Sequence, residues 1–342
     1  MFLFLSITSC TLFKKKYLEL FIKILIGGLL AWAIYRQVFA RQDIDMLWKS
    51  LVAKFVYPNH LWLFMVLLLA PLNIAFEAMK WHELIKSFTS MKKWRVFKAV
   101  LSGITIAIFT PNRVGEYGGR ILFVSPEHNW KAVIATVVGS LAQLLILLSF
   151  GLLGLMVFSN HFLKTETYVL SLVVSMGAVL IGVMLFSFFN IDMLVPLVKR
   201  IPFIQHFKRF FKHLLVLKNY HKQELWKALG FAFLRYATYS LQYYFLLKFY
   251  GIPISPFIGL AGIATIFFVQ ASIPLPPVMG LLARGEIALY VWGNFSEDQA
   301  AILAATFTLF VINIAVPALL GMVFIVQSNI LKSLGYENGN EV

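Results

Sequence analysis

The sequence predicts an all-α fold, namely a polytopic membrane helix bundle with about six full spans and two opposed re-entrant hairpins. Three observations predict it. Hydrophobic residues make up 60% of the chain and charged residues only 13%, about half of the ~25% that is usual in soluble domains. The apolar residues form long blocks, several of them close to the roughly 20 residues that a spanning helix needs. The Lys and Arg residues behind the net charge of +15 lie mainly between these blocks, which favours an anionic membrane surface over nucleic acid as their partner.

The order of the spans follows from the apolar blocks and from the positive-inside rule. Lys14, Lys15 and Lys16 precede the first block, which places the N-terminus in the cytoplasm. The second span returns the chain to a basic loop between Lys80 and Lys98, as the rule requires. The predicted spans are residues 18–39, 60–79, 130–158, 167–189, 228–250 and 300–327.

The apolar piece over residues 99–124 is predicted to be a hairpin that enters and leaves the bilayer on the cytoplasmic side. If this piece crossed once, the loop over residues 190–227 would lie outside, although it carries eight Lys and Arg residues. A re-entrant hairpin keeps that loop in the cytoplasm, in agreement with the positive-inside rule.

Residues 254–293 are predicted to form a second hairpin, which enters from the outside. Its middle contains Pro276 and Pro277, which remove backbone donors and break a helix, and Gly280 follows them. Two opposed broken elements are typical of inverted-repeat transporters, whose sites lie at the bilayer midplane. Residues 44–55 and 203–215 are predicted to be interfacial amphipathic helices.

The strongest local signal is the run Pro111-x-Arg113-x-Gly115-Glu116-x-x-x-Arg120. Charges at bilayer depth are costly, and on a helix Glu116 can pair with both arginines. The positive charge that remains suits an anionic ligand such as a phosphate. The alternative is that the cluster only locks the hairpin together. Small residues along the run allow a headgroup or another helix to approach closely, and these are Gly115, Gly118 and Gly119.

The second hairpin adds Arg284 and Glu286 as candidate substrate-binding residues. Because they are two positions apart, they cannot face each other on a helix. We therefore expect cross-pairing with the first hairpin, either of Arg284 with Glu116 or of Glu286 with Arg113.

Secondary candidates lie on the second and fifth spans. They are Asn73, Glu77 and Lys80 on the second span and Arg235 on the fifth. The alternative for Glu77 and Arg235 is that they snorkel to the interface. Two further polar residues, Gln143 and Asn313, are expected to form hydrogen bonds between helices.

The run from Thr110 to Glu116, with Arg120 after it, resembles the hairpin motif of the flippase-like transmembrane family of lysylphosphatidylglycerol synthases. This family includes the flippase half of the bacterial multiple peptide resistance factor. The Asn73…Glu77…Trp81 run is similar to its second-span pattern. The Pro276-Pro277…Gly280…Glu286 segment is similar to its second signature, but departs from the usual proline–glycine–glycine form. The resemblance covers residues 20–325 and implies movement of an anionic lipid between leaflets. It also implies a bacterial-type cytoplasmic membrane.

The resemblance does not imply synthesis, because aminoacyl transfer in the bifunctional relatives belongs to a separate soluble domain. We expect residues 1–342 to form a single transmembrane domain without that catalytic domain, with both termini in the cytoplasm. No metal-ligand spacing and no nucleophile–base arrangement stand out, so we expect no metal, no cofactor and no enzyme activity. A polyprenyl-phosphate-dependent glycosyltransferase using Asp43 or Asp45 is an alternative, although either residue can cap the following helix. An accessory membrane subunit is another, and the oligomeric state stays open.

Overall fold

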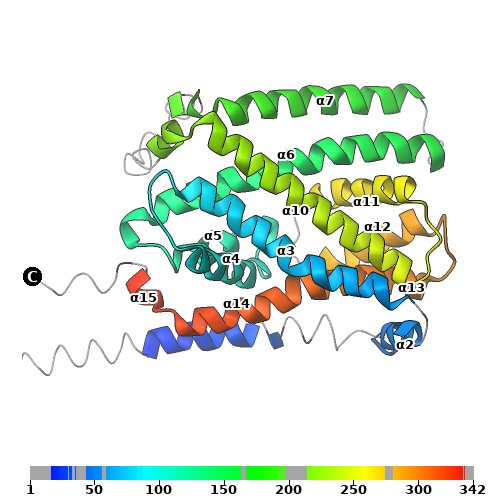
Figure 1. Cartoon of the computed structure of the whole chain (residues 1–342), viewed down its shortest axis with the longest axis horizontal. Coiled ribbons are helices and arrows are strands. Elements are labelled where there is room, and N and C mark those ends of the chain that lie inside the picture. The colour runs from blue at the N-terminus through cyan, green and yellow to red at the C-terminus, as the bar shows by residue number, and fades with distance from the viewer. Residues whose placement is uncertain are drawn as a thin grey trace, which may run out of the picture.

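The computed structural model describes residues 17–29, 31–32, 35, 44–55, 59–162, 167–193, 195–196, 214–273, 280–333 and 335. Every regular element in these parts of the chain is helical. Most of the long helices run side by side along the longest axis of the molecule (Figure 1). Residues 17–29 form the first helix. The labelled helices are α2 (Ile44–Phe55), α3 (His60–Ile85), α4 (Lys93–Ala107), α5 (Gly115–Ile121), α6 (Asn129–Phe162), α7 (Thr167–Phe189), α10 (Lys222–Phe249), α11 (Pro256–Ala271), α12 (Gly280–Trp292), α13 (Gln299–Phe310), α14 (Val316–Gln327) and α15 (Ile330–Ser333).

Four of the described helices are long and apolar enough to cross a membrane. They are His60–Ile85, Pro126–Ser159, Tyr168–Phe189 and Gln299–Gln327, and they coincide with four of the six predicted spans. The fifth predicted span, residues 228–250, lies within α10 and the turn after it. Helix α10 has 28 residues and a length of about 42 Å, but its polar residues lower its mean hydropathy. The first predicted span, residues 18–39, is described mainly by the continuous helix over residues 17–29. The chain is therefore a polytopic membrane protein built as an α-helical bundle.

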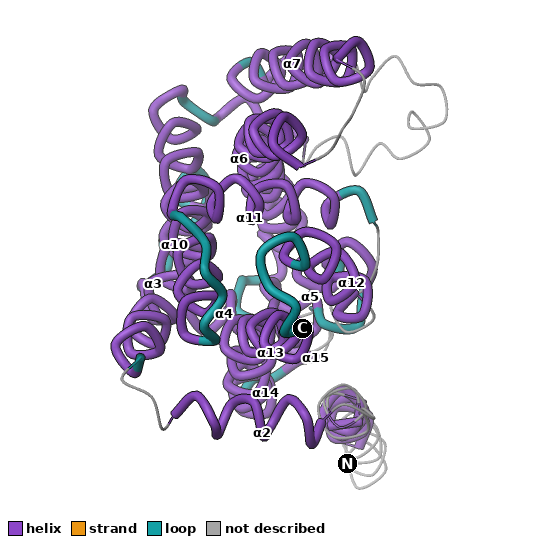
Figure 2. Tube along the Cα trace, turned by 90° about the vertical axis from the view of Figure 1, so that its right-hand side faces the viewer, coloured by secondary structure: helices purple, strands orange, loops and turns teal. Residues whose placement is uncertain are grey.

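Two large apolar clusters form much of the interior of the described chain. One contains Trp81, Leu101 and Ala135, and the other contains Tyr243 and Trp292. Helix α3 packs along α10, α6 packs on α11, and α4 packs on α14. Helix α7 lies at the outer edge of the bundle beside α6 (Figure 2).

The first hairpin consists of α4, a 3₁₀ turn over Pro111–Arg113, and α5. The two helices touch at two glycines. A Cβ atom on Gly119 would lie 2.4 Å from the carbonyl oxygen of Ser102, and one on Gly115 would lie 2.5 Å from that of Ile106. Gly118 is different, because a Cβ atom there would meet nothing within 4 Å. No other helix of the described chain therefore approaches Gly118 closely, and the alternative expectation, that a headgroup does so, stays a prediction.

The second hairpin consists of α11 and α12, which pack against each other. Pro276 and Pro277 lie outside the described residues, and Gly280 is the first residue of α12. The two hairpins occupy opposite ends of the bundle (Figure 1). Which side of a membrane each hairpin faces stays a prediction. The predicted amphipathic helix 44–55 is present as α2, whereas residues 203–213 lie outside the described chain.

Candidate functional site

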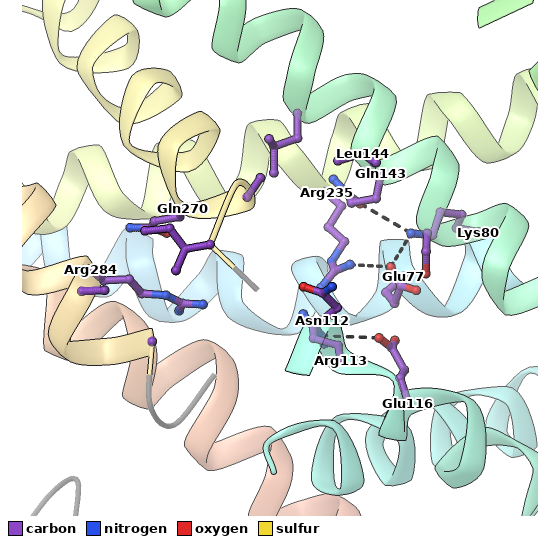
Figure 3. A pocket seen from close by; sticks show the side chains of 16 residues that line it. Glu77, Lys80, Asn112, Arg113, Glu116, Gln143, Leu144, Arg235, Gln270 and Arg284 are labelled. Carbon is purple, nitrogen blue, oxygen red and sulfur yellow. Dashed lines mark hydrogen bonds and ion pairs between the residues drawn. The ribbon is translucent and has the colours of Figure 1, made fainter. Parts of the chain in front are cut away.

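The tip of the first hairpin and the described helix ends of the second hairpin line one cavity in the middle of the bundle. Its larger part has a volume of about 460 Å³ and is lined by charged side chains from five helices or turns (Figure 3). A neighbouring part of about 270 Å³ shares Arg113, Gln143, Arg235, Gln270 and Arg284 with it. We call the two parts together the polar cavity. The charged residues that line it are Glu77, Lys80, Arg113, Glu116, Arg235 and Arg284.

Glu77 is the centre of the ion-pair network in this cavity. Its Oε2 atom lies 2.6 Å from Nη1 of Arg235 and 2.7 Å from Nζ of Lys80. Its Oε1 atom accepts a hydrogen bond of 2.6 Å from Nη2 of Arg120. The three cations come from α3, α5 and α10, so one buried carboxylate joins three helices. Glu77 is only 4% exposed, which shows that the snorkelling interpretation is wrong for this residue.

Glu116 pairs with both arginines of its own motif, as the spacing predicts. It accepts a hydrogen bond from Nη2 of Arg120, and its Oε2 atom lies 3.4 Å from Nε of Arg113. Arg120 is buried, and its guanidinium lies 5.3 Å from the ring centre of Trp81. Because Arg120 does not line the polar cavity, it supports the two carboxylates from behind.

Asn73 and Asn313 extend the network to the last span. The side chain of Asn73 donates a 2.6 Å hydrogen bond to Oδ1 of Asn313 and accepts a 3.2 Å bond from Nε of Arg235. Asn313 belongs to a π-helical turn, Val311–Ala315, between α13 and α14. π-Helical turns are often found at functional sites. Arg235 is thus held by two residues of α3 and points into the bundle, so the snorkelling interpretation is wrong for it too.

The tip of the first hairpin adopts a rare backbone conformation. Asn112 and Arg113 have φ angles of 50° and 59°, in the left-handed region that non-glycine residues seldom occupy. Such strain costs of order 1–3 kcal/mol per residue and persists only where the surrounding structure fixes it. Here it directs the Arg113 side chain toward the cavity (Figure 3).

Arg284 enters the cavity from the second hairpin, at the side opposite Glu77 (Figure 3). The described part of the chain provides no ion-pair partner for it. Glu286 is exposed and does not line the polar cavity. The expected cross-pairing between the hairpins is therefore wrong. Glu116 is already paired within its own hairpin, and the helical spacing that carries Arg284 inward turns Glu286 away.

The described cluster holds more positive than negative charge. Lys80, Arg113, Arg120, Arg235 and Arg284 face two carboxylates, Glu77 and Glu116, which leaves a surplus of three positive charges. An uncompensated charge is costly in a low-dielectric interior. The arrangement therefore suits an anion such as a phosphate group, for which guanidinium groups are the preferred partners.

Of the other sequence-predicted residues, Gln143 lines this cavity and Asp45 does not. Asp45 is exposed in the first turn of α2, and Asp43 lies outside the described residues. Gln143 connects α6 to its neighbours, since its amide accepts from Lys80 at 3.5 Å and donates to the carbonyl of Ala232 at 3.3 Å. Gln270, at the end of α11, was not predicted to take part, and no spacing in the sequence singled it out.

Comparison with known proteins identifies the family. The family model described as the lysylphosphatidylglycerol synthase TM region matches residues 20–321, which include both hairpins and all the helices that line the polar cavity. No curated protein and no solved structure matches the chain. The chain therefore belongs to the family of the lysylphosphatidylglycerol synthase transmembrane region.

Proposed function

We propose that the chain is a lipid flippase, which moves an anionic lipid with a phosphate or polyprenyl-phosphate group between the leaflets of a bacterial-type cytoplasmic membrane. The observation that carries this proposal is the cationic surplus in the polar cavity, which described residues of both hairpins line. The family description supports a membrane lipid as the substrate. The irregular backbone at Asn112 and Arg113 also supports the proposal, because such backbone at bilayer depth is tolerated where protein buries it or where it lines a water-filled cavity.

The headgroup phosphate would bind Arg113, Arg235 and Arg284. These three guanidinium groups line the cavity from the first hairpin, from α10 and from the second hairpin. Arg120 does not bind the phosphate in this proposal. It pairs with Glu77 and Glu116 behind the cavity wall and holds these two carboxylates in place. The three cavity arginines come from the two hairpins and from α10, so a headgroup bound among them would be in contact with both hairpins.

Movement of labelled lipid across a bilayer tests this function. The protein is reconstituted in phosphatidylcholine vesicles that contain fluorescent phosphatidylglycerol, and the outer-leaflet label is removed with a membrane-impermeant reductant. Wild type should expose the inner-leaflet label, and Arg113→Ala should slow this at least about tenfold, since hydrogen bonds to charged groups contribute about 1.5–3 kcal/mol. Lys227→Gln, an exposed cation on α10, is the matched control.

Two results would contradict the flippase proposal. The first is the absence of any protein-dependent movement of anionic lipids. The second is a sugar-transfer activity that is lost in Asp43→Asn, which would favour the glycosyltransferase alternative. We further propose that both termini lie in the cytoplasm, on the basis of the charge distribution.

A further inference from the structure

An apolar groove lies beside the polar cavity, between α6, α10 and α11. Its volume is about 380 Å³. Helix α10 supplies one wall through residues at i, i+3, i+4, i+7 and i+8, the spacing of a single helical face. These residues are Phe233, Tyr236, Ala237, Ser240 and Leu241.

The other two walls show the same kind of spacing. Helix α6 lines the groove at i, i+3, i+4 and i+7 from Phe150 to Val157, and α11 does so from Phe257 to Ala264. The two helices meet at Gly154, where a Cβ atom would lie only 2.6 Å from the carbonyl oxygen of Ala261. Apart from Tyr236 and Ser240, every lining side chain consists of carbon and hydrogen. The groove is therefore unsuited to a headgroup and suited to a hydrocarbon chain.

The groove adjoins the polar cavity at one residue. Tyr236 lines both of them. The residue before it, Arg235, points into the polar cavity and pairs with Glu77 at 2.6 Å. Adjacent residues of one helix thus face a cationic site and a hydrocarbon surface, as an amphipathic lipid would require.

The outer side of the groove is open. Leu153 and Phe257, on two of its walls, are 59% and 66% exposed in the described structure, so the groove faces the region where lipid surrounds the bundle. The groove-lining part of α10, from Phe233 to Leu241, is about 12 Å long. This length is comparable to the roughly 15 Å of hydrocarbon in one leaflet.

We propose that this groove holds one hydrocarbon chain of the same anionic lipid whose headgroup occupies the polar cavity, with Tyr236 at the junction. The proposal rests on the proposed function and adds to it a site for the lipid tail. A hydrocarbon chain in a bilayer is already out of water, so the hydrophobic effect does not favour its transfer into the groove. The groove therefore selects the hydrocarbon chain by van der Waals packing. The chain enters sideways from the lipid and does not pass through the polar cavity.

Photo-crosslinking tests the groove directly. The probe is phosphatidylglycerol with a diazirine in one acyl chain, added to vesicles that contain the wild-type protein, and adducts are mapped by mass spectrometry. Adducts on residues 233–241 should exceed those on α7, which also faces lipid, by about fivefold, equivalent to about 1 kcal/mol. Ala237→Phe fills the groove and should remove this excess. Gly230→Phe, where a Cβ atom meets nothing within 4 Å, should retain it.

The outcomes separate the groove from the headgroup site. Adducts spread evenly over α7 and α10, or an excess on 233–241 that survives Ala237→Phe, would overturn the groove while leaving the transport test of Arg113 unaffected. Equal labelling by diazirine phosphatidylcholine, with no effect of Arg284→Gln, would overturn the headgroup site. That result would also overturn the inference that cavity and groove serve one lipid.

Discussion

Glu77 on α3 and Arg120 on α5 are joined by a 2.6 Å ion pair in the interior of the bundle. This contact connects the second span of the chain to the first hairpin, 43 residues later. Both side chains are almost fully buried. A buried carboxylate that neutralises cations from three helices fixes their relative positions, and it does so next to the cavity that we assign to the lipid headgroup.

Removing the Glu77 carboxylate should destabilise the protein. Glu77→Gln leaves Lys80, Arg120 and Arg235 without their shared partner, and breaking a buried ion pair costs about 3–5 kcal/mol. Thermal unfolding in detergent should show a clearly lower midpoint. Glu83→Gln is the matched control on the same helix, because its pairs with Lys86 and Lys227 involve exposed lysines and contribute at most about 1 kcal/mol. Equal midpoints for the two variants would contradict the central role of Glu77.

Arg120 and Glu77 should be energetically coupled. If Arg120 serves mainly to neutralise Glu77 and Glu116, removing both members of the Glu77–Arg120 pair costs less than the sum of the single changes. Unfolding of Glu77→Gln, Arg120→Gln and the double variant measures this coupling. Additive effects would show that the pair does not act as a unit.

Gly118 and Gly119, two of the three glycines of α5, should respond in opposite ways to the same substitution. Gly119→Ala places a methyl group 2.4 Å from a backbone oxygen of α4, and such overpacking costs about 1–3 kcal/mol. Gly118→Ala adds the same group into open space and should be neutral or stabilising by up to about 1 kcal/mol, because alanine favours helices. Unfolding midpoints of the two variants provide the comparison, and a similar loss in both would contradict the close approach of α4 and α5.

Much of this site was predictable from local spacing. Arg113, Glu116 and Arg120 are three and four positions apart, and the structure shows the two ion pairs that this spacing allows. The four most apolar spans were also predictable, since a block of about 20 apolar residues has few other structures available to it.

The parts that the sequence did not predict depend on contacts between distant segments. The central role of Glu77 requires its side chain to reach cations on both α5 and α10, and residue spacing within α3 carries no information about those contacts. The misassigned partners of Arg284 have the same origin. The predicted partner, Glu116, is paired with Arg113 and Arg120 of its own hairpin, and sequence spacing within the second hairpin says nothing of that competition.

The sidedness of the bundle is open to a labelling experiment. Cys10 is the single cysteine, so Cys10→Ser provides a background for single introduced cysteines. Lys218→Cys, before α10, should react with a membrane-impermeant maleimide only from the cytoplasmic side, and Glu297→Cys, before α13, only from the outside. Both positions are exposed. External labelling of residue 218 would contradict the re-entrant assignment of the first hairpin, because that assignment rests on keeping the 190–227 loop inside.

The most direct measurement is the rate of transbilayer movement of phosphatidylglycerol in vesicles for Arg284→Gln, with Glu286→Gln as its matched control on the same helix. Arg284 lines the polar cavity and has no ion-pair partner among the described residues, so its loss should leave the unfolding midpoint nearly unchanged and slow lipid movement at least about tenfold. Glu286→Gln should move lipid at the wild-type rate. An Arg284→Gln variant that moves anionic lipid as fast as wild type would contradict the assignment of this cavity to the lipid headgroup.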